Sequence, residues 1–196
     1  MAPPSYYKTG REARMLPVFS SERLVFRPFQ RSDVPAVFKL FSDPETMKFD
    51  GGETMNHLSE AEWLIDAYTH LAPDARSMRW AVVLKDGGHF IGSAGFHQID
   101  WHHRRAEIGG EMLKPYRRKG LATEAMHRLI RFGFETMGFH RLTAMVSPYN
   151  HDAERLVQRG PFVMEGRLRE WERWGGRWID LKVYGLLQHE WRHGGN

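Results

Sequence analysis

The stretch that decides the fold runs from Glu107 to Phe134 and reads EIGGEMLKPYRRKGLATEAMHRLIRFGF. Its first part, up to Leu113, is an apolar run typical of a buried strand. A basic loop with the pattern R-x-x-G-x-A follows over 117–122. It leads directly into an amphipathic helix, whose apolar residues recur at spacings of three and four. The stretch therefore predicts one strand–loop–helix unit, with the glycine loop at the start of the helix.

The loop has the properties of an anion-binding site. The first turn of a helix has N–H groups without intrahelical partners, and the aligned peptide dipoles place partial positive charge there. Gly120 lets a ligand approach the backbone, while Arg117, Arg118 and Lys119 add positive charge. The pattern predicts a phosphate cradle, and the plainer alternative is a basic loop before an ordinary capped helix. Nucleoside triphosphate hydrolysis is not supported, because G-x-x-x-x-G-K-[ST] is absent.

Length and composition place the chain among globular proteins. It has 196 residues, of which 41% are hydrophobic and 13% aromatic, enough for one domain with a sizeable core. It has no cysteine, which excludes disulfides, cysteine-ligated zinc and a thiol nucleophile. No apolar run reaches the roughly 18 residues of a membrane span, and the N-terminus lacks the apolar core of a signal peptide. We therefore expect a cytoplasmic protein without a membrane partner.

The formal net charge of +4 suits a polyanionic ligand, and it also suits a role in solubility. The basic residues are scattered and no RNA-binding motif occurs, so we do not expect nucleic acid to be the partner. An RNA-binding protein is still a competing hypothesis, and it would show a strongly salt-dependent affinity for RNA.

Hydrophobic periodicity predicts helices and strands over 17–192, in one domain, after a flexible lead-in over 1–16. Helices are predicted near 33–42, from Ser59 onward, over 121–134 and over 153–158, and strands near 24–27, 79–85, 89–97, 106–113, 141–147, 162–170 and 177–187. The helix after Ser59 is expected to bury one side, formed by Trp63, Leu64, Ala67 and Leu71. The glycine-rich residues 48–58 are predicted to form a loop. Together these elements predict a mixed α/β (α+β) sandwich with a central, mostly antiparallel sheet flanked by helices.

The opening stretch resembles the pyrophosphate-binding motif of the GNAT acyltransferases, which bind acetyl-CoA. The resemblance continues in the family's order over about residues 19–187, through segments similar to its ribosomal-protein N-acetyltransferase (RimJ/RimL-like) branch. These segments are SERLVFRPF (21–29), WAVV (80–83), FIGSAGF (90–96), AEIG (106–109), HRLTA (140–144) and EGRLRE (165–170). The resemblance implies a GNAT-like fold and transfer of an acetyl group from acetyl-CoA to a primary amine. It implies a protein N-terminus or a small molecule as acceptor, in a pocket that residues 48–58 help to shape.

The same resemblance implies the catalytic residues. Glu107 occupies the family's position for a general base, which takes a proton from the acceptor ammonium so that the nitrogen can attack the thioester. Glu111, on the same face of the strand, is the alternative base, and His97 is a candidate to share the work through water. Each of the three also has a plainer role as an ion-paired or structural residue. No metal is implied.

The implied acetyl-CoA contacts fall on three segments. Backbone groups of Met112 and Leu113 are expected to pair with the pantetheine amides, as an added strand would. The pyrophosphate is expected to bind the loop residues Arg117, Arg118, Lys119, Gly120, Leu121, Ala122 and Thr123. Asn150 resembles the asparagine that contacts the pantetheine arm, and its plainer role is that of a turn residue after Pro148.

Two positions depart from the family pattern. Ala153 stands where the family commonly has a serine that can protonate the leaving thiolate, which leaves Tyr149, water or no acid at all for that step. The family's Gly-Phe appears as Gly160-Pro161-Phe162, so that turn is altered. These departures keep open a non-catalytic acyl-CoA-binding module. The phosphate loop also cannot distinguish acetyl-CoA from another donor such as succinyl-CoA.

Three tryptophans, Trp171, Trp174 and Trp178, lie near the last predicted hairpin. We expect them to pack on the core as alternate strand residues. The functional alternative is a wall of the acceptor pocket or a dimer contact, and the family resemblance also suggests a homodimer.

Overall fold

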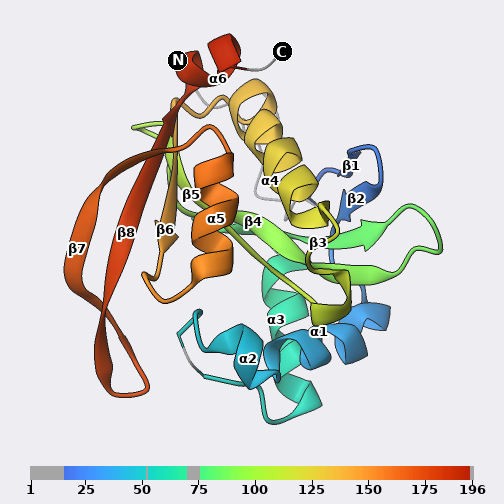
Figure 1. The fold of residues 1–196 in the computed structure, drawn as a ribbon. Helices are drawn as coiled ribbons and strands as arrows, with labels where there is room; N and C mark the ends of the chain where they lie inside the picture. The colour runs from blue at the N-terminus through green and yellow to red at the C-terminus, as the bar shows by residue number, and fades with distance from the viewer. Residues whose placement is uncertain (1–15, 52, 70–75, 195–196) are drawn as a thin grey trace.

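The computed structural model describes residues 16–51, 53–69 and 76–194, with the side chains of 192–194 excepted. Over these residues the chain forms one eight-stranded sheet with helices on both faces (Figure 1). The predicted lead-in lies outside the described residues except for Leu16, which is buried in the core. The predicted fold class, a mixed α/β sheet flanked by helices, is confirmed.

The sheet is mostly antiparallel, as predicted. Its order is β1-β2-β3-β4-β5-β6-β8-β7, and among the described strands only β5 and β6 pair in parallel. The strands are β1 Phe19–Ser20, β2 Leu24–Arg27, β3 Met78–Leu84, β4 Phe90–Asp100, β5 Arg105–Met112, β6 Arg141–Val146, β7 Val163–Trp174 and β8 Arg177–Leu187. A parallel pair needs a crossover connection, and the helix predicted after the glycine loop supplies it.

Helices form a layer on each face of the sheet. They are η2 Arg31–Asp33, α1 Val34–Phe41, α2 Pro44–Met47, α3 Leu58–Thr69, η3 Lys114–Tyr116, α4 Leu121–Arg131, its π-helical extension η4 Phe132–Thr136, α5 His151–Arg159 and α6 Gln188–Gly194. Helices α4 and α5 pack on one face, and α1 and α3 on the other (Figure 1).

Alternation along β3 separates two hydrophobic cores. Met78, Trp80 and Val82 belong to the larger core under α4 and α5, whereas Ala81 belongs to the smaller core under α1 and α3. This is the period of two that a strand buried on both faces requires. The sheet is therefore held between two separately packed layers of helices.

The prediction for α3 is wrong in one respect. Leu64 packs against the smaller core as predicted. Trp63 and Ala67 are exposed, Trp63 by 74%, and the fully buried residues of the helix are Ala61 and Ile65. Apolar residues occur on both sides of this helix, and packing against α1 decides which side is buried. Leu71, expected on the same side, lies outside the described residues.

Strands β7 and β8 extend past the end of β6 as a two-stranded arm (Figure 1). Trp171 and Trp178 lie on this arm and are 57% and 59% exposed. Trp174 donates its indole N–H to Glu172 at 2.7 Å. The prediction that the three tryptophans pack on the core is therefore wrong for Trp171 and Trp178, because the strand pair continues where none of the described helices covers it.

Candidate active site

Strands β5 and β6 separate at Glu107. Their parallel pairing joins residues 105–107 to residues 141–143, although β5 runs on to Met112. Beyond Glu107, the edge of β5 that faces β6 has no partner among the described strands. The two strands therefore open into a divergence that begins beside the Glu107 carboxylate.

Backbone bonds define which groups face this divergence. Leu113 donates its N–H to the Ile91 carbonyl at 2.9 Å and accepts the Tyr116 N–H at 3.0 Å. Backbone directions alternate along a strand, so the N–H and carbonyl of Met112 point the other way, toward the divergence. The Met112 carbonyl accepts the Arg117 Nε–H at 2.7 Å. Of the two residues expected to meet pantetheine, Met112 is the one whose N–H faces the opening.

Glu107 lies on the face of the sheet that carries α1 and α3, as the register with Ala81 and Ser93 shows. His97 stands directly opposite on β4, and its Nε2 lies 3.1 Å from Glu107 Oε2. The side chains of Glu107 and His97 are 30% and 43% exposed. This carboxylate is therefore reachable by a ligand from that face.

Glu111, the alternative base, lies on the same face in an ion pair with Arg79 of β3. It also accepts the Ser93 hydroxyl at 2.9 Å, and that hydroxyl accepts the Arg79 Nε–H at 2.9 Å. The Glu111 side chain is only 11% exposed. Proton transfer to Glu111 would disrupt these charge-assisted bonds, so Glu107 is the better candidate for a base.

The three basic residues of the loop differ in what they contact. Arg117 turns inward, where its guanidinium donates to the Met112 carbonyl and to the Thr46 hydroxyl, each at 2.7 Å. Arg118 and Lys119 are exposed, and Arg118 has a left-handed backbone with φ of 60°. Arg117 therefore shapes the loop, while Arg118 and Lys119 present their charge to solvent.

Gly120 begins helix α4 with φ of 77°, a conformation that glycine adopts without strain. Leu121 is buried and anchors the first turn in the larger core. The N–H groups of Leu121, Ala122 and Thr123 belong to this first turn and have no carbonyl one turn earlier to bond. The start of α4 therefore combines backbone donors, the helix dipole and two exposed cations, a combination that suits a phosphate.

Glu124 ties α4 to the turn between β1 and β2. Its carboxylate accepts the Ser21 hydroxyl and the Arg23 backbone N–H at 2.7 Å each, and the Arg23 Nε–H at 2.6 Å. Burial raises the pKa of Glu124, but these bonds outweigh burial and leave the pKa below its ordinary value. Arg23 also donates to the Lys119 carbonyl at 3.2 Å, so it braces the loop as well. The sequence gives no local signal for this role of Arg23, about a hundred residues away from Glu124.

Asn150 caps helix α5, because its side-chain oxygen accepts the Ala153 N–H at 3.1 Å. This cap fixes the asparagine at the start of α5, and a contact with pantetheine stays a prediction. Ala153 is half-buried against the larger core, Tyr149 is exposed, and Phe162 of the altered turn is buried.

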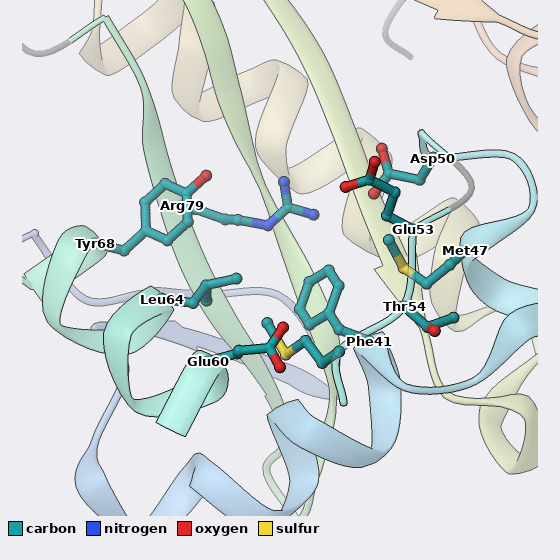
Figure 2. A pocket seen from close by; sticks show the side chains of 10 residues that line it. Phe41, Met47, Asp50, Glu53, Thr54, Glu60, Leu64, Tyr68 and Arg79 are labelled. Atoms are coloured by element: carbon teal, nitrogen blue, oxygen red, sulfur yellow. The ribbon is translucent and has the colours of Figure 1, made fainter. Parts of the chain in front are cut away.

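A cavity of about 390 Å³ opens between α1, α3 and β3, on the face that carries Glu107 (Figure 2). It is lined by Phe41, Met47, Asp50, Glu53, Thr54, Met55, Glu60, Leu64, Tyr68 and Arg79. Arg79 points toward the side where Asp50 and Glu53 lie (Figure 2), and it also pairs with Glu111 of β5. Three lining carboxylates outnumber one ion-paired cation, so the cavity is negatively charged. Several of these residues come from the predicted loop over 48–58.

Two features are absent from the described part of the chain. No three His, Asp or Glu side chains within 16–51, 53–69 and 76–194 gather in a way that could hold a metal ion. In the same part of the chain, no helix has the length and apolar character needed to cross a lipid bilayer.

Comparison with known proteins agrees with the fold. A mixed sheet that opens next to a glycine-capped helix is the architecture of an acyltransferase, and the family model of the acetyltransferase (GNAT) domain matches residues 23–163. The uncharacterized N-acetyltransferase YoaA of Bacillus subtilis is 32% identical over 174 residues, which are 89% of this chain and 98% of that protein. The chain belongs to the GNAT acetyltransferase family.

Two solved structures show the same fold. An acetyltransferase of the GNAT family from Bacillus anthracis is 26% identical and aligns with a TM-score of 0.79, covering 88% of this chain and 99% of that chain. The spermidine N-acetyltransferase of Vibrio cholerae, in a complex with CoA and spermine, is 25% identical with a TM-score of 0.77 and the same coverage.

Proposed function

We propose that this protein transfers an acetyl group from acetyl-CoA to a primary amine, with Glu107 as the general base. The observation that carries the proposal is the position of Glu107 at the point where β5 leaves β6. The same strand leads through the Met112 edge to the exposed cations of the loop. A thioester donor such as acetyl-CoA needs a site for its phosphates, which the loop would supply. An amine acceptor needs a base, which would stand at the other end of the same free strand edge.

The residues at the loop fit the pyrophosphate of CoA. Arg118, Lys119 and the first-turn N–H groups of α4 would hold it, with Gly120 allowing close approach. The free edge of β5 at Met112 would pair with the pantetheine amides, and Asn150 would lie beside the arm. Bound there, acetyl-CoA supplies an activated acetyl group as a thioester.

Glu107 takes a proton from the acceptor ammonium, which frees the nitrogen lone pair for attack. The bond from nitrogen to the acetyl carbon forms as the bond from that carbon to sulfur breaks. The nitrogen loses its remaining excess proton as the amide forms, and water carries that proton to the released thiolate, because Ala153 offers no donor at the position where the family resemblance implies a serine.

The negative cavity beside Arg79 supports a cationic acceptor, such as a small molecule with more than one ammonium group. The spermine-bound relative from Vibrio cholerae supports the same class of acceptor. A protein N-terminus, which the ribosomal-protein branch implies, is the second candidate and carries the same reactive group. The cytoplasm, where acetyl-CoA and such amines meet, is the proposed location.

Glu107→Gln tests the proposal, because the amide keeps the shape of the side chain and cannot accept the proton. We expect kcat to fall about 10²- to 10³-fold, with the CoA dissociation constant unchanged within about twofold. The assay follows thiol release from acetyl-CoA and from succinyl-CoA with a panel of amines and N-terminal peptides. CoA affinity is measured by calorimetry on the same protein.

The outcomes separate the alternatives. Full turnover of the Glu107→Gln variant would remove this residue from the mechanism. CoA binding without thiol release for any amine would identify a non-catalytic acyl-CoA-binding module. Faster release from succinyl-CoA would correct the donor.

A further inference from the structure

A histidine side chain lies beside the carboxylate of the candidate base. His97 and Glu107 are directly paired across β4 and β5, and 3.1 Å separates His97 Nε2 from Glu107 Oε2. The two atoms therefore lie within the range of a hydrogen bond or ion pair.

A glycine makes room for this arrangement. A Cβ atom placed on Gly109 would lie 3.2 Å from His97 Cε1 and 3.8 Å from Nδ1, so the imidazole lies over the bare backbone at this position. Contact at 3.2 Å is tighter than most packed carbon atoms show, so an added methyl group would push the ring away by a few tenths of an ångström. The His97 ring therefore packs on Gly109, which lies two residues along β5 from the base.

Other charged side chains around the pair already have partners. Arg79 pairs with Glu111, Arg105 lies 3.6 Å from Asp100, and Arg141 pairs with Glu165. These pairs come from every strand that flanks Glu107 on this face. Among the described residues, His97 is the side chain that the structure gives Glu107 as an ion-pair partner.

We infer that His97 is a positioning residue for Glu107. Its Nε2–H holds Oε2, fixes the carboxylate, and leaves Oε1 to take the proton of the acceptor. The inference rests on the proposed function, in which Glu107 is the base. It adds a specific hydrogen bond and a specific glycine to the machinery that orients that base.

The first test compares His97→Ala with His97→Gln. Alanine removes the donor, and we expect kcat to fall about 10- to 100-fold while the KM for acetyl-CoA changes less than about twofold. The glutamine amide N–H can replace Nε2–H, so we expect His97→Gln to recover kcat to within about threefold of the wild type. His102→Ala, an exposed histidine in the β4–β5 turn, is the matched control and should retain full activity.

Double mutants show whether the effect passes through the base. In the Glu107→Gln background, His97→Ala should lower kcat no further, because the group it orients is gone. Gly109→Ala should reduce kcat on its own by displacing the ring, and should add nothing in the His97→Ala background. A Gly109→Ala effect that persists in that background would mean that the methyl group obstructs the acceptor instead.

Three results overturn the inference: full kcat in His97→Ala, no recovery in His97→Gln, or additive effects of His97→Ala and Glu107→Gln. The proposed function fails separately, through full turnover of Glu107→Gln or no turnover of the wild type. Circular dichroism and the thermal midpoint of each variant establish that the compared proteins are folded.

Discussion

Two glutamates four residues apart on β5 face the same side of the sheet and differ in what surrounds them. Glu107 touches one partly exposed histidine, whereas Glu111 is enclosed by Arg79 and Ser93. The Glu111 carboxylate is already paired with a cation and therefore contributes to stability. The Glu107 carboxylate is more accessible and has fewer partners, so it can exchange a proton. The environment, more than the residue type, assigns the two roles.

Glu111→Ala and Glu107→Ala should therefore differ in stability. Removing Glu111 leaves the mostly buried Arg79 without its counter-charge, which costs about 3–5 kcal/mol of unfolding free energy. Removing Glu107 costs less than about 1 kcal/mol, as expected for a partly exposed pair. For a chain of this size the thermal midpoint should fall by about 6–20 °C in the first variant and by less than about 4 °C in the second. Equal midpoints would contradict this assignment.

Sequence reasoning could find Glu107 and the glycine loop because both lie within one continuous pattern. It could not identify the distant residues that contact Glu111 and Glu124. Arg79 lies 32 residues from Glu111, and Arg23 lies 101 from Glu124. Such contacts depend on strand register and sheet order, which a single sequence does not encode locally. The fully buried residues of α3 were missed for a similar reason, since packing against α1 decides them.

At the scale of elements, α4 is fixed at both ends of its first turn. The loop before it is anchored by Arg117 to β5 and α2, and its own Glu124 bonds to the β1–β2 turn. These ties hold the N–H groups at the start of α4 in place before any ligand arrives, which lowers the ordering cost of binding an anion.

The bonds that the Glu124 carboxylate accepts from Ser21 and Arg23, here called the Glu124 tie, predict that the stability of the protein depends on pH. Because the folded-state pKa of Glu124 lies below its ordinary value of 4.5, its contribution is present above that value and is lost as pH falls through the lower, folded-state pKa. Glu124→Gln should lower the unfolding free energy by about 1–2 kcal/mol at pH 7, or the thermal midpoint by about 2–8 °C.

The two midpoints should converge as pH falls below 4.5. Thermal melts of both proteins from pH 7 to pH 3 make the comparison, with Glu135→Gln, an exposed glutamate in η4, as the control. A gap that stays constant down to pH 3 would show that the ionised carboxylate does not carry the tie.

For the whole molecule, the acidic cavity and the cationic loop are distinct regions. The cavity with Asp50 and Glu53 opens between α1, α3 and β3, while the cationic loop precedes α4 at the end of β5. The fold class, a mostly antiparallel sheet flanked by helices, was predicted from hydrophobic periodicity, whereas the order of the strands in the sheet comes from the structure. The length of the β7–β8 arm and the exposure of Trp171 were not predicted, because a strand pattern does not show where the covering layer ends.

This separation predicts that acceptor and donor binding can be changed independently. The double variant Asp50→Asn/Glu53→Gln should raise the KM for a diamine about 3- to 10-fold, since two exposed carboxylates each contribute about 0.2–1 kcal/mol to holding a cation. The KM for a monoamine of equal length and the CoA affinity should stay within about twofold. Steady-state kinetics with both amines measure the effect, and an equal rise for both amines would show that the cavity does not recognise the second charge.

The central claim is that the loop and the start of α4 hold the paired phosphates of CoA beside Glu107. Calorimetric titration with CoA and with pantetheine, which lacks those phosphates, tests it most directly, in the wild type and in Arg118→Glu/Lys119→Glu. We predict that the wild type binds CoA at least about 100-fold more tightly than pantetheine, and that charge reversal removes most of this difference. Equal affinity of the wild type for the two ligands, or a preference for CoA that survives the reversal, would contradict the account.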